Sequence, residues 1–423
     1  MPAVAGRRPR CRNRRGSCLP PACRTTAARW TIKPWLELRS MTSREAYIVL
    51  NRIEGIGPVK VRALCEALGS PEAVLSASAD GLAAVRGVGP KGAENIVSQR
   101  GGLDAGREEA AAAKLGARLV TPVDPDYPAS LKTIYDPPLC LYVRGALEKK
   151  DEQALAIVGT RRVSHYGAAQ AERLAYQASK AGFVIVSGMA RGIDTVAHRA
   201  ALKAGGRTIA VLGGAMDKLY PPENRELAEE IAAHGALISE FPLGREPDRT
   251  TFPYRNRVVS GLSKGVLVVE AGLDSGAMNT AEQALEQGRS VMAVPGRVDM
   301  EGSKGPHRLI QNGARLVEDL SDILKEFEFL FPPAEQARLV RQQDARQRLT
   351  LAPAEESVVR ALWTEPDLDF DDLIRRTGLS SARLMTLSMQ LEMKRVLRRL
   401  PGRRLALMDE IRQWELSPAE ETP

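Results

Sequence analysis

The sequence has few of the residues that build disulfide frameworks, metal centres or membrane spans. Its 423 residues include five cysteines, with no Cys-x-x-Cys pair, and four scattered histidines. No apolar run approaches the ~20 residues that a membrane helix requires. We therefore expect no disulfide scaffold, no metal site and no membrane span, and a reducing cytoplasm as the compartment.

Several enzyme signatures are also absent from the sequence. There is no G-x-x-x-x-G-K-[ST] phosphate loop, no G-x-S-x-G nucleophile elbow and no H-E-x-x-H metal motif. Gly159-Thr-Arg-Arg162 does not continue as the G-x-G-x-x-G dinucleotide fingerprint. Nucleotide hydrolysis and standard dinucleotide binding are disfavoured, and we expect no cofactor.

The excess of positive charge is confined to the start of the chain. The formal net charge is +8, but residues 1–40 contain ten of the 60 basic residues and only one of the 52 acidic ones. The remaining residues are close to neutral, so overall charge does not indicate nucleic-acid binding by the folded part. Residues 1–40 lack an apolar period and are expected to be disordered, and Met41 is the expected true start.

The segment 183–198 combines an apolar strand, a glycine turn and a helix. It reads Phe183-Val-Ile-Val-Ser-Gly-Met-Ala-Arg-Gly-Ile-Asp-Thr-Val-Ala-His198. This arrangement aims backbone N–H groups at an anion, and Arg191 adds a guanidinium suited to phosphate. Asp194 and His198 are four residues apart, so they share a helix face and can touch. Alternatively, this is an ordinary strand–helix unit whose glycines only turn the chain.

Short apolar strands alternate with helices from residue 154 to about 320. The pattern predicts an α/β fold with a Rossmann-like, doubly wound and mostly parallel sheet. Turns of small residues follow nearly every strand and should share one sheet edge, where ligands bind in such folds. Four arginines in these turns (161, 162, 191 and 297) indicate a groove that recognises phosphate. The expected strands span residues 155–158, 183–186, 208–212, 236–238, 266–269 and 291–294.

The segment Phe252-Pro-Tyr-Arg-Asn-Arg257 precedes an expected helix and sets two aromatic rings beside two arginines. Aromatic rings stack on unpaired bases and arginine binds phosphate, so the segment is a candidate contact for single-stranded nucleic acid. The alternative is a structural loop held by Phe252, with its arginines paired to Glu240 or Glu270.

Glu270 and Glu282 flank the Ser275-Gly276 turn. Two carboxyl groups in this position could serve as acid and base in a glycosidic cleavage. They could equally form ion pairs with Arg255 or Arg257.

Helical segments flank the predicted sheet. Ile53-Glu-Gly-Ile-Gly57 and Val85-Arg-Gly-Val-Gly89 resemble helix-hairpin-helix units, which present backbone N–H groups to phosphates; a small helical bundle used for packing is the alternative. Near the C-terminus, three helices and a hairpin rich in arginine look like a winged helix, either for nucleic acid or for protein contact. The hairpin arginines are 395, 398, 399, 403 and 404.

The expected organisation has six parts. They are a disordered basic segment (1–40), a helical helix-hairpin-helix/SAM-like domain (41–114), an extended Rossmann-like domain (115–331), a linker (332–352), a winged-helix-like domain (353–410) and a tail (411–423).

At these motifs the chain resembles the bacterial DNA processing protein A family, called DprA or Smf. The matching strings run in unbroken order from about residue 120 to 320, and one departure is Val163, where the family often has proline. The strings include Ala156-Ile-Val-Gly-Thr-Arg-Arg162, Ser187-Gly-Met-Ala-Arg-Gly-Ile-Asp194, Ala210-Val-Leu-Gly-Gly214, Ser239-Glu-Phe-Pro242, Phe252-Pro-Tyr-Arg-Asn-Arg257 and Val294-Pro-Gly296.

The resemblance implies a non-enzymatic protein that binds single-stranded DNA, protects incoming DNA in natural transformation and loads the RecA recombinase. It also implies a homodimer formed through the Rossmann-like domain. From the motifs and the strand-end turns, the expected DNA-binding residues are Arg161, Arg162, Ser187, Gly188, Arg191, Gly192, Phe252, Arg255, Asn256, Arg257, Ser275 and Gly276. Asp194, His198 and Glu270 are expected to support the shape of the site.

A nucleotide-processing enzyme is the alternative. Related Rossmann-like proteins cleave nucleoside monophosphates with a glycine-rich loop and acidic residues. Their Pro-Gly-Gly-x-Gly-Thr string is missing here, where Ala271-Gly-Leu-Asp-Ser-Gly276 takes its place.

Overall fold

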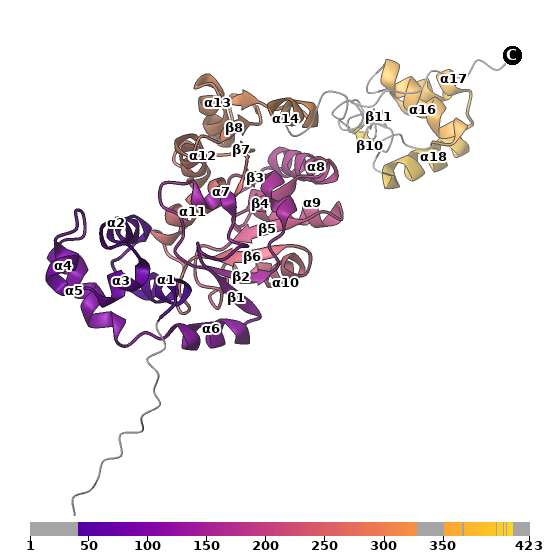
Figure 1. Cartoon of the computed structure of the whole chain (residues 1–423). Coiled ribbons are helices and arrows are strands. Elements are labelled where there is room, and N and C mark those ends of the chain that lie inside the picture. The colour runs from indigo at the N-terminus through magenta and orange to yellow at the C-terminus, as the bar shows by residue number, and fades with distance from the viewer. Residues whose placement is uncertain are drawn as a thin grey trace, which may run out of the picture. The chain divides into compact units, whose positions relative to one another are not determined.

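The structure of the chain is a computed structural model that describes residues 41–327 and 351–408, except 366, 367, 395, 401 and 403 (Figure 1). The expected basic segment 1–40, most of the linker 332–352 and the tail 411–423 lie outside these residues, as do two hairpin arginines, Arg395 and Arg403. Within the described ranges, none of the helices has the length and apolar character needed to cross a membrane.

Two glycine hairpins organise the first helices of the described chain. Gly55 has a φ of +76° and Gly87 a φ of +86°, a backbone region that other residues rarely adopt. The first hairpin joins α1 to α2 and the second leads from α4 into α5, which confirms the predicted helix-hairpin-helix pattern. The helices are α1 (Ser43–Arg52), α2 (Pro58–Leu68), α3 (Pro71–Ser76), α4 (Ala79–Ala83), α5 (Gly89–Arg100) and α6 (Ala105–Lys114).

A nine-stranded sheet carries the candidate site, and its strand order is β1-β2-β6-β5-β4-β3-β7-β8-β9. The strands from β3 to β9 pair in parallel, whereas β1 and β2 form an antiparallel edge beside β6. The predicted fold class is therefore confirmed, although the sequence did not indicate β1 or β9. The strands are β1 (Ala117–Val120), β2 (Leu141–Gly145), β3 (Ala154–Val158), β4 (Val184–Ser187), β5 (Thr208–Val211), β6 (Ala236–Ser239), β7 (Gly265–Val268), β8 (Ser290–Ala293) and β9 (Arg315–Leu316).

The chain reverses direction across the sheet at β3. From β3 it runs outward through β4, β5 and β6, and it then returns to β7 on the other side of β3. Leu155 and Ile157 of β3 join the core beneath α8, α9 and α14, whereas Ala156 and Val158 join the core beneath α11 and α12. Helices on both faces and a strand-order reversal are the features that create a ligand crevice in open α/β sheets.

The connecting helices agree with the alternating pattern of the sequence. They are α7 (Ala129–Lys132), η1 (Lys149–Gln153), α8 (His165–Lys180), α9 (Ile193–Lys203), η2 (Pro222–Asn224), α10 (Arg225–His234), α11 (Thr251–Leu262), α12 (Gly276–Glu286), η3 (Glu301–Ser303), α13 (Lys304–Gln311) and α14 (Leu320–Glu326). One expectation needs correction: Phe252 to Arg257 lie inside α11 and not in a loop before a helix.

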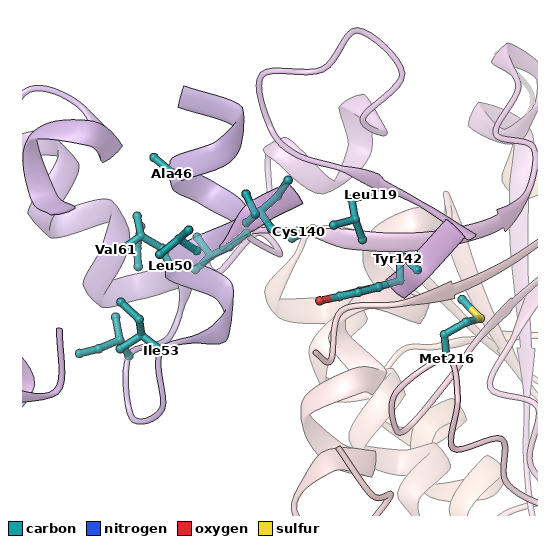
Figure 2. Packing of buried hydrophobic residues seen from close by; sticks show 14 of the residues in the cluster. Ala46, Leu50, Ile53, Val61, Leu119, Cys140, Tyr142 and Met216 are labelled. Carbon is teal, nitrogen blue, oxygen red and sulfur yellow. The ribbon is translucent and has the colours of Figure 1, made fainter. Parts of the chain in front are cut away.

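A shared hydrophobic cluster joins α1 to the antiparallel edge of the sheet. Leu50 of α1 belongs to the same buried cluster as Tyr142 of β2 (Figure 2). The Tyr142 hydroxyl donates to Glu108 Oε1 at 2.6 Å, and Asn51 Nδ2 donates to the backbone carbonyl of Glu240 at 3.2 Å. The first hairpin therefore has the packing role that the sequence left open.

The C-terminal described residues fold around a separate buried cluster that includes Leu373 and Leu391. Three helices precede a two-stranded hairpin, and Gly378 ends the second helix with a φ of +66°. This confirms the predicted winged-helix arrangement. The elements are α16 (Pro353–Thr364), α17 (Phe370–Thr377), α18 (Ser381–Met393), β10 (Leu397–Leu400) and β11 (Arg404–Leu407).

Candidate nucleic-acid interface

The loops that follow β3, β4 and β7 meet where the strand order reverses. Together with the first turns of α11 and α12 they surround a cavity of about 510 Å³. Many of the residues expected to bind DNA line it together: Arg161, Arg162, Gly188, Phe252, Arg255, Asn256, Ser275 and Gly276.

Arg161 and Phe252 combine a positive charge with an aromatic face. The guanidinium carbon of Arg161 lies 4.8 Å from the centroid of the Phe252 ring, a cation–π distance. The ring of Tyr220 approaches Phe252 with a centroid separation of 6.0 Å. Arg161 and its neighbour Arg162 are both exposed at the cavity, so their charges can reach a ligand.

Arg255 is a fixed and buried part of the cavity wall. Its guanidinium donates to the carbonyl of Gly188 at 2.6 Å and also to the carbonyl of Val211. A Cβ atom at position 188 would lie 2.5 Å from this guanidinium, so any residue larger than glycine would have to displace Arg255. Burial lowers the pKa of Arg255 to about 10, which still leaves the side chain charged at neutral pH.

Asp194 shapes the glycine turn after β4. One of its carboxylate oxygens accepts hydrogen bonds from the backbone N–H groups of Gly188 at 3.1 Å and Ala190 at 3.2 Å. Between them, Met189 is buried with a φ of +61°, and Asn224 Nδ2 donates to its carbonyl at 3.0 Å. Burial raises the pKa of Asp194, while Arg255 nearby opposes that effect.

The N-terminus of α12 faces the cavity. Ser275 caps this helix by accepting from the N–H of Ala277 at 3.3 Å, and both Ser275 and Gly276 line the cavity. Asn256 Nδ2 donates to the Gly276 carbonyl at 3.1 Å and thereby ties α12 to α11. A helix N-terminus carries partial positive charge, so it adds to the attraction for an anion.

Two arginines expected at the site are engaged elsewhere. Arg257 is buried and ion-paired with Glu240 and, at 2.9 Å, with Asp136. Arg191 is half-exposed and ion-paired with Glu223 over the ring of Tyr220. Neither residue lines the cavity, which corrects their expected placement.

Two further residues of the glycine turn also lie outside the cavity lining. The Ser187 side chain is buried and donates to the carbonyl of Ile157 at 2.6 Å. Gly192 has a φ of +80°, and a Cβ atom there would lie 2.2 Å from the carbonyl oxygen of Thr160. Both therefore hold the turn in place and do not offer groups to a ligand.

Of the three residues expected to support the site, Asp194 holds the glycine turn, whereas His198 and Glu270 contact other groups. His198 is buried with Nδ1 2.7 Å from Thr208 Oγ1, so it does not brace Asp194 as expected. Glu270 accepts from the backbone N–H of Ser164 at 3.0 Å and from its hydroxyl, and it fixes the start of α8. Because Glu270 and Glu282 are not in the cavity lining, the predicted acid–base pair is not assembled there.

Sequence reasoning missed two acidic residues at the cavity, Asp274 and Glu301. Asp274 stands in the turn before α12, and its position between Gly272 and Gly276 was the available signal. Glu301 follows β8 in the chain and lies at the cavity because η3 places it there. No local sequence pattern predicts this position. Arg297, in the same loop, was expected in the crevice but is ion-paired with Asp299 and lies outside the lining.

Three family models match successive parts of the chain. A family model described as DNA recombination-mediator protein A matches residues 118–328, a SAM-like helix-hairpin-helix tandem matches 47–100, and a DprA winged helix domain matches 342–403.

Individual relatives agree with the family models. Protein Smf of Synechocystis is 39% identical over 67% of this chain and 72% of its own length. The DNA processing protein DprA of Streptococcus pneumoniae is 44% identical over 49% of this chain and 73% of its own length. A solved structure of DprA from that organism superposes with a TM-score of 0.59 at 35% identity and covers 68% of this chain and 99% of that one. The chain therefore belongs to the DNA recombination-mediator protein A family, whose members carry the names DprA and Smf.

Proposed function

We propose that the chain binds single-stranded DNA in the cavity formed by the loops that follow β3, β4 and β7. In this proposal it protects incoming DNA in natural transformation and loads RecA recombinase onto it, without catalysing a reaction. Membership of a family of recombination mediators, with relatives named DNA processing proteins, supports this role.

The observation that carries the proposal is the pairing of Arg161 with Phe252 at the cavity. Single-strand binders combine cationic groups for the phosphates with aromatic faces on which bases stack. The Phe252 ring and the exposed guanidinium of Arg161 supply both within 4.8 Å. A duplex keeps its bases stacked on each other, so it cannot use the Phe252 face in this way.

The N-terminus of α12 supplies a second phosphate contact in this proposal. A Cβ atom at Gly276 would meet nothing within 4 Å, so the backbone there is open to close approach. The positive end of the helix dipole and the charges of Arg161 and Arg162 would then act on neighbouring phosphates of one strand.

Homodimerisation, the RecA contact, a cytoplasmic location and the six-part domain organisation also belong to this proposal. Family membership supports the first two, and the near absence of cysteine from the sequence beyond residue 40 supports a reducing compartment.

The test is fluorescence anisotropy with a labelled oligothymidylate and a matched duplex across a salt series. We expect preference for the single strand, with log affinity falling linearly in log salt. Arg161→Ala should weaken single-strand binding about tenfold, the effect of losing a charged hydrogen bond. Phe252→Ala should weaken it by about 1–3 kcal/mol, the usual contribution of one stacked base.

Arg297→Ala is the matched control, because Arg297 is also an arginine of a strand-end loop but lies outside the cavity lining. It should leave affinity unchanged. Equal losses in Arg161→Ala and Arg297→Ala would contradict binding at the cavity.

A nucleotide-processing enzyme is the second candidate, and the carboxylates of Asp274 and Glu301 at the cavity favour it. Their negative charge would oppose phosphate but could serve acid–base chemistry. Incubating the chain with nucleoside monophosphates and assaying free base distinguishes the two. Base release that disappears in Glu301→Gln, without affinity for oligothymidylate, would establish the enzyme instead.

A further inference from the structure

We propose that the single-strand site extends beyond the cavity to Tyr220 and Arg191, and that Glu223 limits its strength by competing with a backbone phosphate for Arg191. This inference rests on the proposed single-strand binding and adds one stacking ring and one phosphate contact to it. Arg191 stands in the glycine turn before α9, Glu223 belongs to η2, and Tyr220 comes shortly before η2.

Tyr220 continues the aromatic surface of the cavity outward. Its ring centroid lies 6.0 Å from that of Phe252, and the two ring planes are inclined at 57°. Phe252 lines the cavity, whereas Tyr220 lies outside the lining and is 39% exposed. Single-strand binders stack successive bases on aromatic faces of this kind. A strand with one base against Phe252 therefore has a second ring available for the adjacent base.

Arg191 places a cation at this second ring, as Arg161 does at Phe252. The guanidinium carbon of Arg191 lies 5.7 Å from the centroid of the Tyr220 ring, and Nη1 donates to the Tyr220 hydroxyl at 3.4 Å. The corresponding distance from Arg161 to the Phe252 ring is 4.8 Å. Two rings and two arginines thus form one continuous series, which suits a strand that presents bases and phosphates in turn.

Glu223 already binds the face of Arg191 that a phosphate would use. One oxygen of its carboxylate accepts from Nε of Arg191, and the other accepts from Nη2 at 3.2 Å. A phosphate would be bound through the same pair of N–H groups, so the carboxylate and the phosphate exclude each other. The two side chains are 52% and 48% exposed, and an ion pair this open to water is weak enough for a phosphate to replace it.

The backbone around this ion pair is fixed, so an exchange of partners requires only side-chain movement. Asn224, next to Glu223, is buried, and its Nδ2 donates to the carbonyl of Met189 at 3.0 Å and to Thr195 Oγ1 at 2.8 Å. These bonds attach η2 to the glycine turn that carries Arg191. Glu223 therefore stays within reach of Arg191 and competes for it throughout binding.

Removing the charge of Glu223 tests the competition. Glu223→Gln in the full chain keeps the shape of the side chain but frees Arg191, so fluorescence anisotropy should show oligothymidylate affinity raised about threefold, the scale of an exposed ion pair. The plot of log affinity against log salt should become steeper by at most about 0.7, the value for one phosphate contact with a single strand.

Glu229→Gln is the matched control for this change. Glu229 forms a similar two-bond ion pair with Arg144, which is paired with the start of β6 and so lies at the opposite edge of the sheet from the cavity. This variant should change neither the affinity nor the salt dependence. An equal gain in Glu229→Gln would show a general effect of charge and would overturn the competition.

The same substitution in an Arg191→Ala background separates competition from simple repulsion between Glu223 and DNA. Arg191→Ala alone should lower oligothymidylate affinity about fivefold, less than an unopposed charged contact would give. If Glu223 acts by occupying Arg191, then Glu223→Gln should bring no gain once Arg191 is absent. A gain that persists in the double variant would contradict the proposed role of Glu223.

Tyr220→Leu tests the second ring, because leucine keeps apolar bulk but has no aromatic face. It should weaken oligothymidylate binding about tenfold, within the range for one stacked base, and Tyr220→Phe should lose clearly less. Equal losses in these two variants, or no loss in either, would overturn the extension. If Arg161→Ala still weakens binding as predicted, the cavity proposal survives that result, whereas a wild type that does not bind oligothymidylate refutes both proposals.

Discussion

Among single residues, His198 is a side chain that the fold holds in its neutral form. Its ring is buried, Nδ1 is bonded to Thr208, and Nε2 has no hydrogen-bond partner among the described residues. Burial lowers the pKa of His198 to about 3, with the nearby charge of Arg255 acting in the same direction. The unfolded chain has the ordinary histidine pKa of about 6.5. Between these two values the unfolded state binds a proton that the folded state rejects, so stability falls as pH drops below about 6.5.

Replacing His198 with glutamine should remove this pH dependence. We expect the free energy of unfolding of the wild type, relative to His198→Gln, to decrease as pH falls from 6.5 to 4, by at most about 1.4 kcal/mol per pH unit. Urea unfolding at several pH values measures it. Burial raises the pKa of Glu240 to about 7, so this group destabilises the fold as pH rises from 4.5 to 7. The wild type and His198→Gln share this contribution, so it cancels in the difference between their free energies of unfolding. Parallel pH profiles would contradict the assignment.

At the scale of one element, the residues of α11 serve two different roles, depending on the face of the helix on which they lie. Phe252, Arg255, Asn256 and Val259 follow helical spacing and line the cavity. Arg257 lies on another face, where its guanidinium carbon is 4.2 Å from the centroid of the Tyr254 ring and its charge meets Glu240 and Asp136. The helix therefore joins the cavity proposed to bind DNA on one side to a buried ion-pair network on the other.

Arg257→Ala should separate stability from binding. Removing one partner of a buried ion pair leaves Glu240 uncompensated, which costs about 3–5 kcal/mol. We expect a large loss in the free energy of unfolding, with oligothymidylate affinity of the folded protein within twofold of wild type. Arg245→Ala removes an exposed arginine just before α11 and should leave stability nearly unchanged. If Arg257→Ala lost as much oligothymidylate affinity as Arg161→Ala, Arg257 would have to be assigned to the DNA site after all.

The sequence could predict the fold and the sheet edge that carries the candidate site, but not which side chains line the cavity there. Alternating strands and helices follow from local periodicity, and the shared edge of a parallel sheet follows from topology. Helical spacing directs Arg257 away from Arg255, whereas the expected loop before a helix would let both arginines reach the site. Arg191 is ion-paired with Glu223, and Glu270 accepts a hydrogen bond from Ser164. Both partners are distant in sequence, so no local pattern could identify them.

On the scale of the whole molecule, the excess positive charge and the cavity proposed to bind DNA lie in different parts of the chain. The ten basic residues of 1–40 account for the net charge of +8, and the remaining sequence is nearly neutral. The cavity itself balances Arg161, Arg162 and Arg255 against Asp194, Asp274 and Glu301. Long-range attraction to nucleic acid and local recognition of a single strand are thus expected to be separable.

A variant that begins at Met41 tests this separation. Without residues 1–40, it should pass through a cation exchanger at pH 7 that retains the full chain, and its binding to duplex DNA should become weaker and less salt-dependent. The ratio of wild-type to Arg161→Ala affinity for oligothymidylate should be the same in the full chain and in the variant that begins at Met41. If that ratio collapses when 1–40 is removed, the cavity does not act independently.

The carboxylate of Asp194 has a consequence for how a ligand is received. In phosphate-binding loops the turn amides point at the ligand and donate their hydrogen bonds to it. Here the amides of Gly188 and Ala190 are already bonded to an anion that the protein itself supplies. The turn is therefore ordered before any DNA enters, and binding loses no conformational entropy in arranging it. Because the Asp194 carboxylate already occupies these amides, the turn itself offers no hydrogen bonds to a ligand anion. Attraction for such an anion then comes from the arginines and from the N-terminus of α12.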